Sequence, residues 1–149
     1  MIDPANDVSV RLYLPPAAAG GKLPVVMYFH GGGFMVESAA SVRYHRYLNT
    51  LAARAGAVAV DDQRLSSASA VAPPLALLPT ARLLVAVAGV DFLATKGRAY
   101  HAALLACGWR GEAELEDTPG VDHVFHLMRP GTEAAEKLMD RVVAFIARA

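Results

Sequence analysis

Leu23-Pro24-Val25-Val26-Met27-Tyr28-Phe29-His30-Gly31-Gly32-Gly33-Phe34 is the stretch that decides the fold. Its first part is an apolar run rich in β-branched and aromatic residues, which predicts a buried strand over 23–29, covered on both faces. The strand leads directly into three glycines, whose backbone N–H groups carry no side chain that would block a ligand. Preorganised N–H groups of this kind stabilise negative charge that develops on an oxygen atom. We therefore expect an oxyanion-binding loop at Gly31, Gly32 and Gly33, with a simple tight turn as the alternative.

The composition is that of a packed globular chain without an unusual charge. The 149 residues suffice to bury a core, and 54% of them are hydrophobic. Basic and acidic residues number 14 each, so neither nucleic acid nor a membrane surface is an expected partner. The single Cys107 excludes an internal disulfide. No apolar run reaches the ~20 residues of a membrane span, and the N-terminus does not resemble a signal peptide. The expected location is the cytoplasm, with the nucleus also open.

Strands and helices alternate along the chain. The expected strands lie over 8–14, 23–29, 57–60, 82–88 and 113–116, and the expected helices over 44–55, 98–107 and from Thr132 onward. The segments 61–80 and 120–126 carry turn-forming residues without clear periodicity and are predicted to be irregular. This alternation predicts an α/β fold with a mostly parallel sheet flanked by helices.

One domain over 1–149 is expected, made of three stretches. Residues 1–60 carry the glycine loop, residues 61–80 form an irregular junction, and residues 81–149 carry Asp91 and His123. Like the glycine loop, Asp91 and His123 follow predicted strands, which is where open α/β sheets place their sites.

Four motifs together resemble the plant carboxylesterases, which belong to the hormone-sensitive-lipase branch of the α/β-hydrolases (α/β-hydrolase fold-3) and are related to the gibberellin receptors. The motifs span residues 10–15, 28–34, 44–48 and 121–126, with the sequences VRLYLP, YFHGGGF, YHRYL and VDHVFH. The resemblance implies carboxylic ester hydrolysis of a small molecule without a cofactor or metal. It further implies that Asp91 orients the imidazole of His123, that His123 is the general base and then the acid, and that Gly31, Gly32 and Gly33 bind the oxyanion.

The sequence departs from this family at the nucleophile. The family carries its serine in a Gly-x-Ser-x-Gly turn between a strand and a helix, and this chain contains no such pattern. The serines that lack the flanking glycines include Ser38, Ser41, Ser66, Ser67 and Ser69. The irregular junction 61–80 stands where the family has its central strand and helix, so we interpret the chain as an incomplete, internally deleted α/β-hydrolase. Its expected activity is absent or very weak.

Two other interpretations stay open. The chain is alternatively a non-catalytic protein that binds a small ligand, as gibberellin receptors do, or an unstable product. The loss of central strands would leave the strands over 23–29 and 82–88 with open edges, unless they pair with each other. Open edges and an uncovered apolar face predict self-association.

Several residues have simpler structural interpretations. Asp91 is alternatively a turn or helix-capping aspartate. His30 and His126 are expected to be structural, and Cys107 a small core residue. Asp122, His123 and His126 lack a further ligand at usable spacing, so no metal site is predicted.

Overall fold

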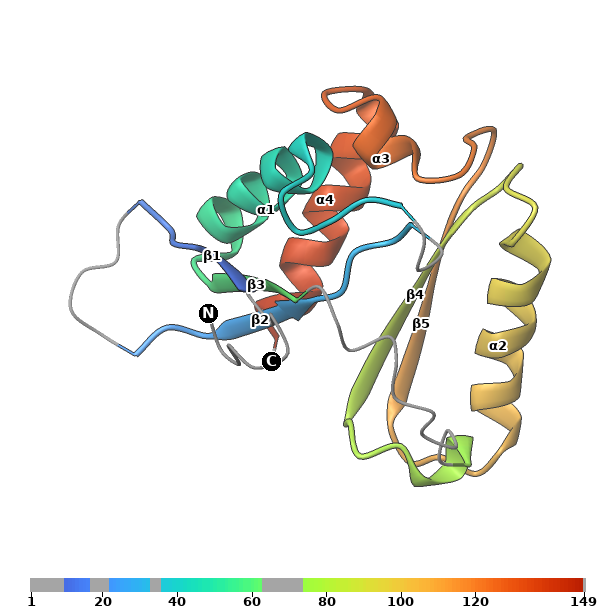
Figure 1. The fold of residues 1–149 in the computed structure, drawn as a ribbon. Coiled ribbons are helices and arrows are strands. Elements are labelled where there is room, and N and C mark those ends of the chain that lie inside the picture. Colours follow the sequence, from blue (N-terminus) through green and yellow to red (C-terminus); the bar gives the residue numbers. More distant parts are fainter. Residues whose placement is uncertain (1–9, 17–21, 33–35, 63–73, 149) are drawn as a thin grey trace. The chain divides into compact units, whose positions relative to one another are not determined.

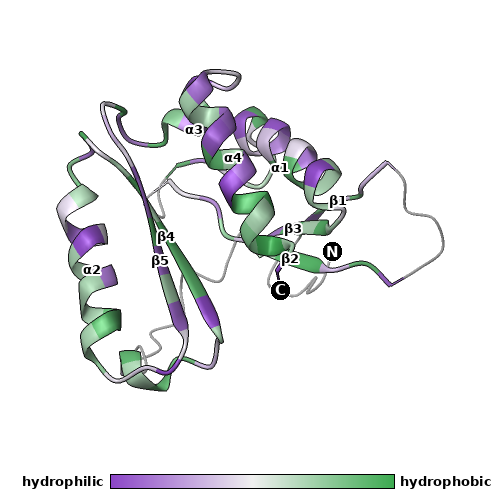
Figure 2. Cartoon of the chain, turned by 180° about the vertical axis from the view of Figure 1, so that it is seen from behind, coloured by the Kyte–Doolittle hydropathy of each residue, from purple (hydrophilic) through white to green (hydrophobic). Residues whose placement is uncertain are grey.

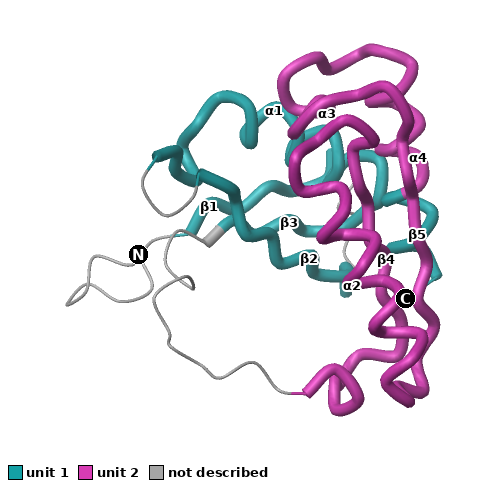
Figure 3. Tube along the Cα trace, turned by 90° about the vertical axis from the view of Figure 1, so that its right-hand side faces the viewer, with its two compact units in different colours: residues 1–69, 142–149 teal, residues 70–141 magenta. Residues whose placement is uncertain are grey.

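The structure is a computed structural model that describes residues 10–16, 22–32, 36–62 and 74–148 (Figure 1). The chain divides into two compact units, residues 1–69 with 142–149 and residues 70–141, which are coloured separately in Figure 3. The expectation of one domain over 1–149 stays a prediction.

The first unit contains a three-stranded sheet in the order β1-β3-β2. Its strands are β1 (Val10–Tyr13), β2 (Val25–Tyr28) and β3 (Val58–Asp62). β2 and β3 run parallel, which requires a crossover, and helix α1 (Val42–Ala55) supplies it. β1 is antiparallel to β3. Gly56 ends α1 in the left-handed conformation with φ 59°, as the sequence predicted.

One face of this sheet packs against α1. The buried side chains of α1 are Tyr44, Leu48, Leu51 and Ala52, and those of the sheet and the residue before β3 are Tyr13, Ala59 and Ala57. Side chains alternate between the two faces of a strand, so the residues between the buried ones point away from α1. Val25 is 64% exposed and Met27 58%. The prediction that this strand is covered on both faces was therefore wrong, because α1 covers only one of them.

The second unit contains two parallel strands connected by a helix. Strand β4 (Arg82–Ala88) pairs with β5 (Glu112–Thr118), and helix α2 (Ala94–Ala106) crosses between them. The unit also holds a short 3₁₀ turn, η3 (Leu75–Leu77), the short helix α3 (Phe125–Met128) and the first part of α4 (Glu133–Ile146).

The elements of the second unit lie where the sequence predicts them, within one or two residues at the ends of β5 and α4, apart from two larger differences. α2 begins at Ala94 rather than at 98, and α3 occupies residues predicted to be a loop. Gly97 lies within the first turns of α2. Glycine is a poor helix former, so the sequence pattern predicted that the helix begins only after Gly97. The structure gives it a packing role, since a Cβ atom at Gly97 would overlap Cγ1 of Val87. Glycine therefore allows α2 to lie close to β4.

Apolar packing and ion pairs hold the second unit together. Leu104 of α2 is 1% exposed, and Val87 of β4 is buried. Figure 2 shows β4 as mainly hydrophobic and β5 as more hydrophilic. The Arg98 guanidinium donates to both Asp117 oxygens, at 2.6 and 3.0 Å, and so links α2 to β5. Arg141 of α4 pairs with Glu114 of β5 and links a second helix to the same strand.

Both β2 and β4 are edge strands. Among the described strands, β2 pairs with β3 and β4 pairs with β5, in two separate sheets. In the described part of the chain, no helix is both long enough and apolar enough to cross a lipid bilayer.

Candidate active site

Backbone hydrogen bonds connect two loops of the second unit, at the points where β4 and β5 end. The Gly89 N–H donates to the Thr118 carbonyl at 2.7 Å, and the Val90 N–H donates to the Val121 carbonyl at 3.0 Å. A Cβ atom at Gly89 would lie only 2.9 Å from the Thr118 oxygen, so this close approach requires glycine. The loop after β4 and the loop after β5 therefore lie side by side.

Asp91 is held in place by the turn that starts α2. Its Oδ1 accepts a hydrogen bond from the Leu93 N–H at 2.8 Å, and its side chain is 11% exposed. Its Oδ2 lies 2.7 Å from Nδ1 of His123. The Leu93 N–H, and secondly His123, lower the pKa of Asp91 below its ordinary value. The Asp91 carboxylate thus serves both as a turn residue and as the partner of His123, and it is ionised at neutral pH.

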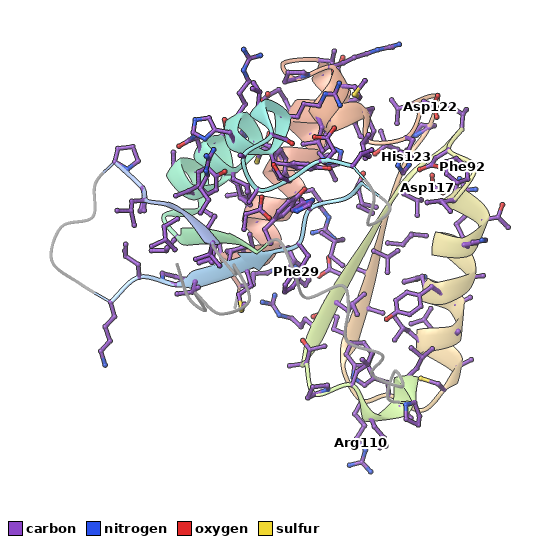
Figure 4. The ribbon with its side chains drawn as sticks, viewed as in Figure 1. Phe29, Phe92, Arg110, Asp117, Asp122 and His123 are labelled. Carbon is purple, nitrogen blue, oxygen red and sulfur yellow. The ribbon has the colours of Figure 1, made fainter. Side chains whose placement is uncertain are left out.

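His123 has one ring nitrogen engaged and the other accessible. Nδ1 bonds Asp91, the side chain is 48% exposed, and no partner for Nε2 occurs among the described residues. The backbone N–H of His123 donates to Asp122 Oδ1 at 2.6 Å, and the Phe92 ring lies 5.5 Å from the imidazole, centroid to centroid (Figure 4). An imidazole oriented by a carboxylate through Nδ1 can exchange a proton at Nε2.

Val124 shows backbone strain next to His123. Its φ and ψ are 46° and 33°, in the left-handed region that a β-branched residue rarely adopts. Such a conformation costs on the order of 1–3 kcal/mol and concentrates at functional sites. α3 starts directly after it, at Phe125. The sequence analysis missed this feature because a Val-Phe pair carries no turn signal.

A cavity of about 400 Å³ opens beside the Asp91–His123 pair. Its walls come from β4, the start of α2, the loop and helix around α3, and Leu138 of α4. Most of its lining is apolar, and the ionisable residues along it are Asp91, Lys96, His123 and His126. The volume lies within the range typical of small-molecule sites. No sequence pattern predicted it, because its walls meet only in the folded unit.

The glycine loop belongs to the first unit. It follows β2, and Gly32 has φ 123°, a conformation in which a Cβ atom would overlap the Val36 carbonyl. The Val36 N–H donates to the Gly32 carbonyl at 3.1 Å. Nδ1 of His30 donates to the Gly31 carbonyl at 2.7 Å, which agrees with a structural role for this histidine. Gly33 lies outside the described residues, and the oxyanion role of the three glycines stays a prediction.

The described part of the chain contains no group of three or more His, Cys, Asp or Glu residues placed to hold a metal ion. Cys107 is partly buried, and its thiol donates to the Leu104 carbonyl at 3.3 Å. This local hydrogen bond at the end of α2 agrees with a packing role.

His126 lies deeper than His123 in the same segment. Burial, and secondly the nearby His123, lower the pKa of His126 to about 4. In the unfolded chain an imidazole titrates near 6.5. Between pH 6.5 and 4 the unfolded state therefore binds more protons, so the free energy of unfolding should fall as the pH falls through this window.

We predict that this loss amounts to roughly 2–3 kcal/mol between pH 7 and pH 4.5. The His126→Gln variant should show a flatter dependence, measured by urea unfolding at both pH values. His101→Gln, in α2 of the same unit, serves as the control and should keep the wild-type slope. A His126→Gln variant with the wild-type slope would contradict the prediction.

Sequence comparison finds relatives among plant enzymes. Tuliposide A-converting enzyme 1 of Tulipa gesneriana, a chloroplastic protein by its name, is 28% identical over 263 positions, covering 98% of this chain and 68% of the relative. These aligned positions exceed the 149 residues of the chain by 114, so the relative has many residues with no counterpart here. "Probable carboxylesterase 7" of Arabidopsis thaliana is 44% identical over 57 residues, covering 38% of this chain and 18% of the relative. No protein-family model matches the chain.

Structure comparison identifies the fold. A hyperthermophilic esterase from the archaeon Pyrobaculum calidifontis matches with a TM-score of 0.76 and 17% identity, covering 95% of this chain and 81% of the esterase. A thermostable carboxylesterase from a metagenomic library matches with a TM-score of 0.74 and 15% identity, covering 95% and 84%. The relatives of this chain are therefore tuliposide-converting enzymes and plant carboxylesterases, and its structural neighbours give it the α/β-hydrolase fold of esterases, of which it retains part.

Proposed function

We propose that the chain descends from carboxylic ester hydrolases and, without a serine nucleophile, hydrolyses small activated esters only very slowly. The observation that carries this proposal is the 2.7 Å contact between Asp91 and His123, combined with the absence of any Gly-x-Ser-x-Gly sequence. The Asp91–His123 pair provides a group that can transfer a proton. Without the Gly-x-Ser-x-Gly turn, the chain lacks the serine oxygen that would attack the ester.

The proposed residual reaction uses water as the nucleophile. Nε2 of His123 takes a proton from a water molecule while Asp91 stabilises the imidazolium. The water oxygen forms a bond to the ester carbonyl carbon, the bond from that carbon to the alcohol oxygen breaks, and the proton passes from His123 to the departing alcohol.

Neither Ser38 nor Ser41, the serines that the structure describes, offers a substitute nucleophile. Residues 70–141, which include Asp91 and His123, contain no serine. Ser38 and Ser41 accept local backbone hydrogen bonds, from Ala40 and Ser38 respectively, in the turn before α1. An enzyme that has lost its triad still accelerates hydrolysis by ~10³–10⁴ over water, whereas working enzymes reach about 10⁶ or more. The lower range is the expected activity.

An internal deletion explains how this state arose. The aligned relative has at least 114 positions that this chain lacks, within a match that covers 98% of the chain. We place the deletion at the junction 61–80, where Asp61-Asp62-Gln63-Arg64-Leu65 is followed by an irregular stretch. The transcript sequence across Val60 to Leu83 tests this: an uninterrupted reading frame that encodes a Gly-x-Ser-x-Gly turn there would overturn the proposal.

A fluorophosphonate probe, which labels activated serines, tests the proposed function directly. The purified chain should remain unlabelled under conditions that label an intact carboxylesterase stoichiometrically. The same preparation should hydrolyse p-nitrophenyl acetate no more than about 10⁴-fold faster than water does. Stoichiometric labelling, or rapid turnover that disappears on mutating one serine, would show that a nucleophile is present.

The cavity favours ligand binding as a second candidate function. Its volume of about 400 Å³ suits a small molecule, and Lys96 and His123 along its lining suit a carboxylate. A carboxylate that binds there should raise the melting temperature by a few degrees when present well above its dissociation constant. A thermal-shift screen of small aromatic and aliphatic carboxylates tests this candidate function. It would count against the candidate function if none of these carboxylates stabilised the protein.

For the compartment we propose the cytoplasm, with the nucleus as a further location. The names of the tulip relatives contain the words chloroplastic and amyloplastic, which makes the plastid the competing location. A fluorescent fusion of the chain expressed in plant cells decides between them, and fluorescence confined to plastids would contradict the proposal.

A further inference from the structure

The cavity in the second unit runs along the open edge of β4. Four consecutive residues, Val85 to Ala88, contribute to its lining. Consecutive side chains on a strand point to opposite faces, so a cavity that contacts all four lies beside the strand and not over one face. On its other side β4 pairs with β5, and no further described strand pairs with β4.

The hydrogen bonds at the two ends of β4 show which backbone groups face this cavity. The Glu112 N–H donates to the Ala81 carbonyl, and the Gly89 N–H donates to the Thr118 carbonyl. In a parallel pair, alternate residues of a strand direct both backbone groups to the same neighbour. The odd-numbered residues of β4 therefore bond β5. Leu84 and Ala86 direct their N–H and C=O groups toward the cavity.

Small and apolar side chains border the cavity on either side of this edge. On one side lie the small residues Ala94 and Gly97 of α2, and on the other Phe125 of α3 and Leu138 of α4. The edge from Leu83 to Ala88 carries no charge and no proline, the features with which natural sheets prevent pairing at an edge. Backbone groups in a row between two apolar walls are the recognition elements of strand addition.

We propose that β4 of a second copy of this chain occupies the cavity in place of a small ligand, antiparallel to β4 of the first copy and related to it by a two-fold axis. Centring the pair on Val85 places Leu84 of each copy opposite Ala86 of the other, which uses all four backbone groups of each edge. Such a contact is isologous and therefore closes as a dimer. A formal net charge of zero favours association between copies.

Proline substitution at the two open edges tests this assignment. Ala86→Pro removes an N–H that β5 does not use, so the unit should stay folded while the dimer is lost. Met27→Pro is the matched control. The Val58 N–H donates to the Pro24 carbonyl, so by the same alternation the N–H of Met27 faces the open edge of β2. Ala86→Val keeps the N–H and should keep the dimer.

Sedimentation velocity over a wide range of protein concentration gives the result. We expect a monomer–dimer equilibrium for the wild type, Met27→Pro and Ala86→Val, and a monomer at every concentration for Ala86→Pro. A wild type that stays monomeric or grows into open aggregates would overturn the proposal. Loss of the dimer in Met27→Pro with its retention in Ala86→Pro would assign the contact to β2 instead, and so would overturn it as well.

Hydrogen exchange of the wild type provides a readout that does not depend on the proline variants folding. The amides of Leu84 and Ala86 should become protected as the concentration rises. The amide of Val85 should be protected at all concentrations, because it already bonds β5. Equal exchange of Leu84 and Ala86 at low and high concentration would contradict the pairing.

Discussion

Replacing His123 with alanine should slow the residual hydrolysis of p-nitrophenyl acetate about a hundredfold, the lower end of what a positioned general base contributes. The physical reason is that Nε2 is the group available to take a proton beside the cavity, with Nδ1 already held by Asp91 at 2.7 Å. The measurement is kcat/KM at neutral pH, corrected for hydrolysis by buffer.

Two further variants sharpen the result. Asp91→Asn keeps a side-chain oxygen for the Leu93 N–H but removes the negative charge that faces His123, so it should also lower kcat/KM. His101→Ala, on α2 and outside the cavity lining, should leave the rate unchanged. A His123→Ala variant as active as the wild type would mean that the hydrolysis arises elsewhere on the protein.

Leu104→Ala should lower the free energy of unfolding by about 3–5 kcal/mol, the cost of a large cavity in a packed core. Leu104 is 1% exposed in α2, the helix that joins β4 to β5. Its neighbour Leu105 is 66% exposed, so Leu105→Ala is a matched control that should change stability by less than about 1 kcal/mol. Urea unfolding, followed by circular dichroism, measures both.

The same experiment distinguishes a folded protein from an unstable product. A domain is stable by only about 5–15 kcal/mol, so the Leu104→Ala loss is a large share of the total. Hydrogen exchange of the wild type should show protected amides in β4, β5 and α2. Similar midpoints for Leu104→Ala and Leu105→Ala, with no protected amides, would indicate a chain without a packed core.

Most of the secondary structure could be predicted from local patterns. The apolar run of β4 and the helical spacing that ends at Gly56 each depend on neighbours in the chain, and both elements formed where expected. The early start of α2 and the existence of α3 could not be predicted. Gly97 weakens the helical pattern, and glycine is needed there because a larger residue would overlap Val87, which is ten residues away in sequence.

The candidate site shows the same division. Asp91 and His123 were proposed from motifs that follow two strands, whereas the strain at Val124 and the placement of Phe92 against His123 had no sequence signal. Strain and ring contacts arise when loops from different strands are forced together, here by the Gly89–Thr118 and Val90–Val121 hydrogen bonds.

The sequence by itself determined the order of the strands and of the three long helices, the Asp91 and His123 positions, and the absence of a serine elbow, because each is a property of neighbouring residues. Only the tertiary structure decided that Asp91 and His123 lie in contact, that β2 is covered on one face, and that β4 borders a cavity. Contacts and coverage depend on which elements pack together. The apolar pattern of a strand predicts that other elements cover it, but it does not show whether the chain contains elements that do so.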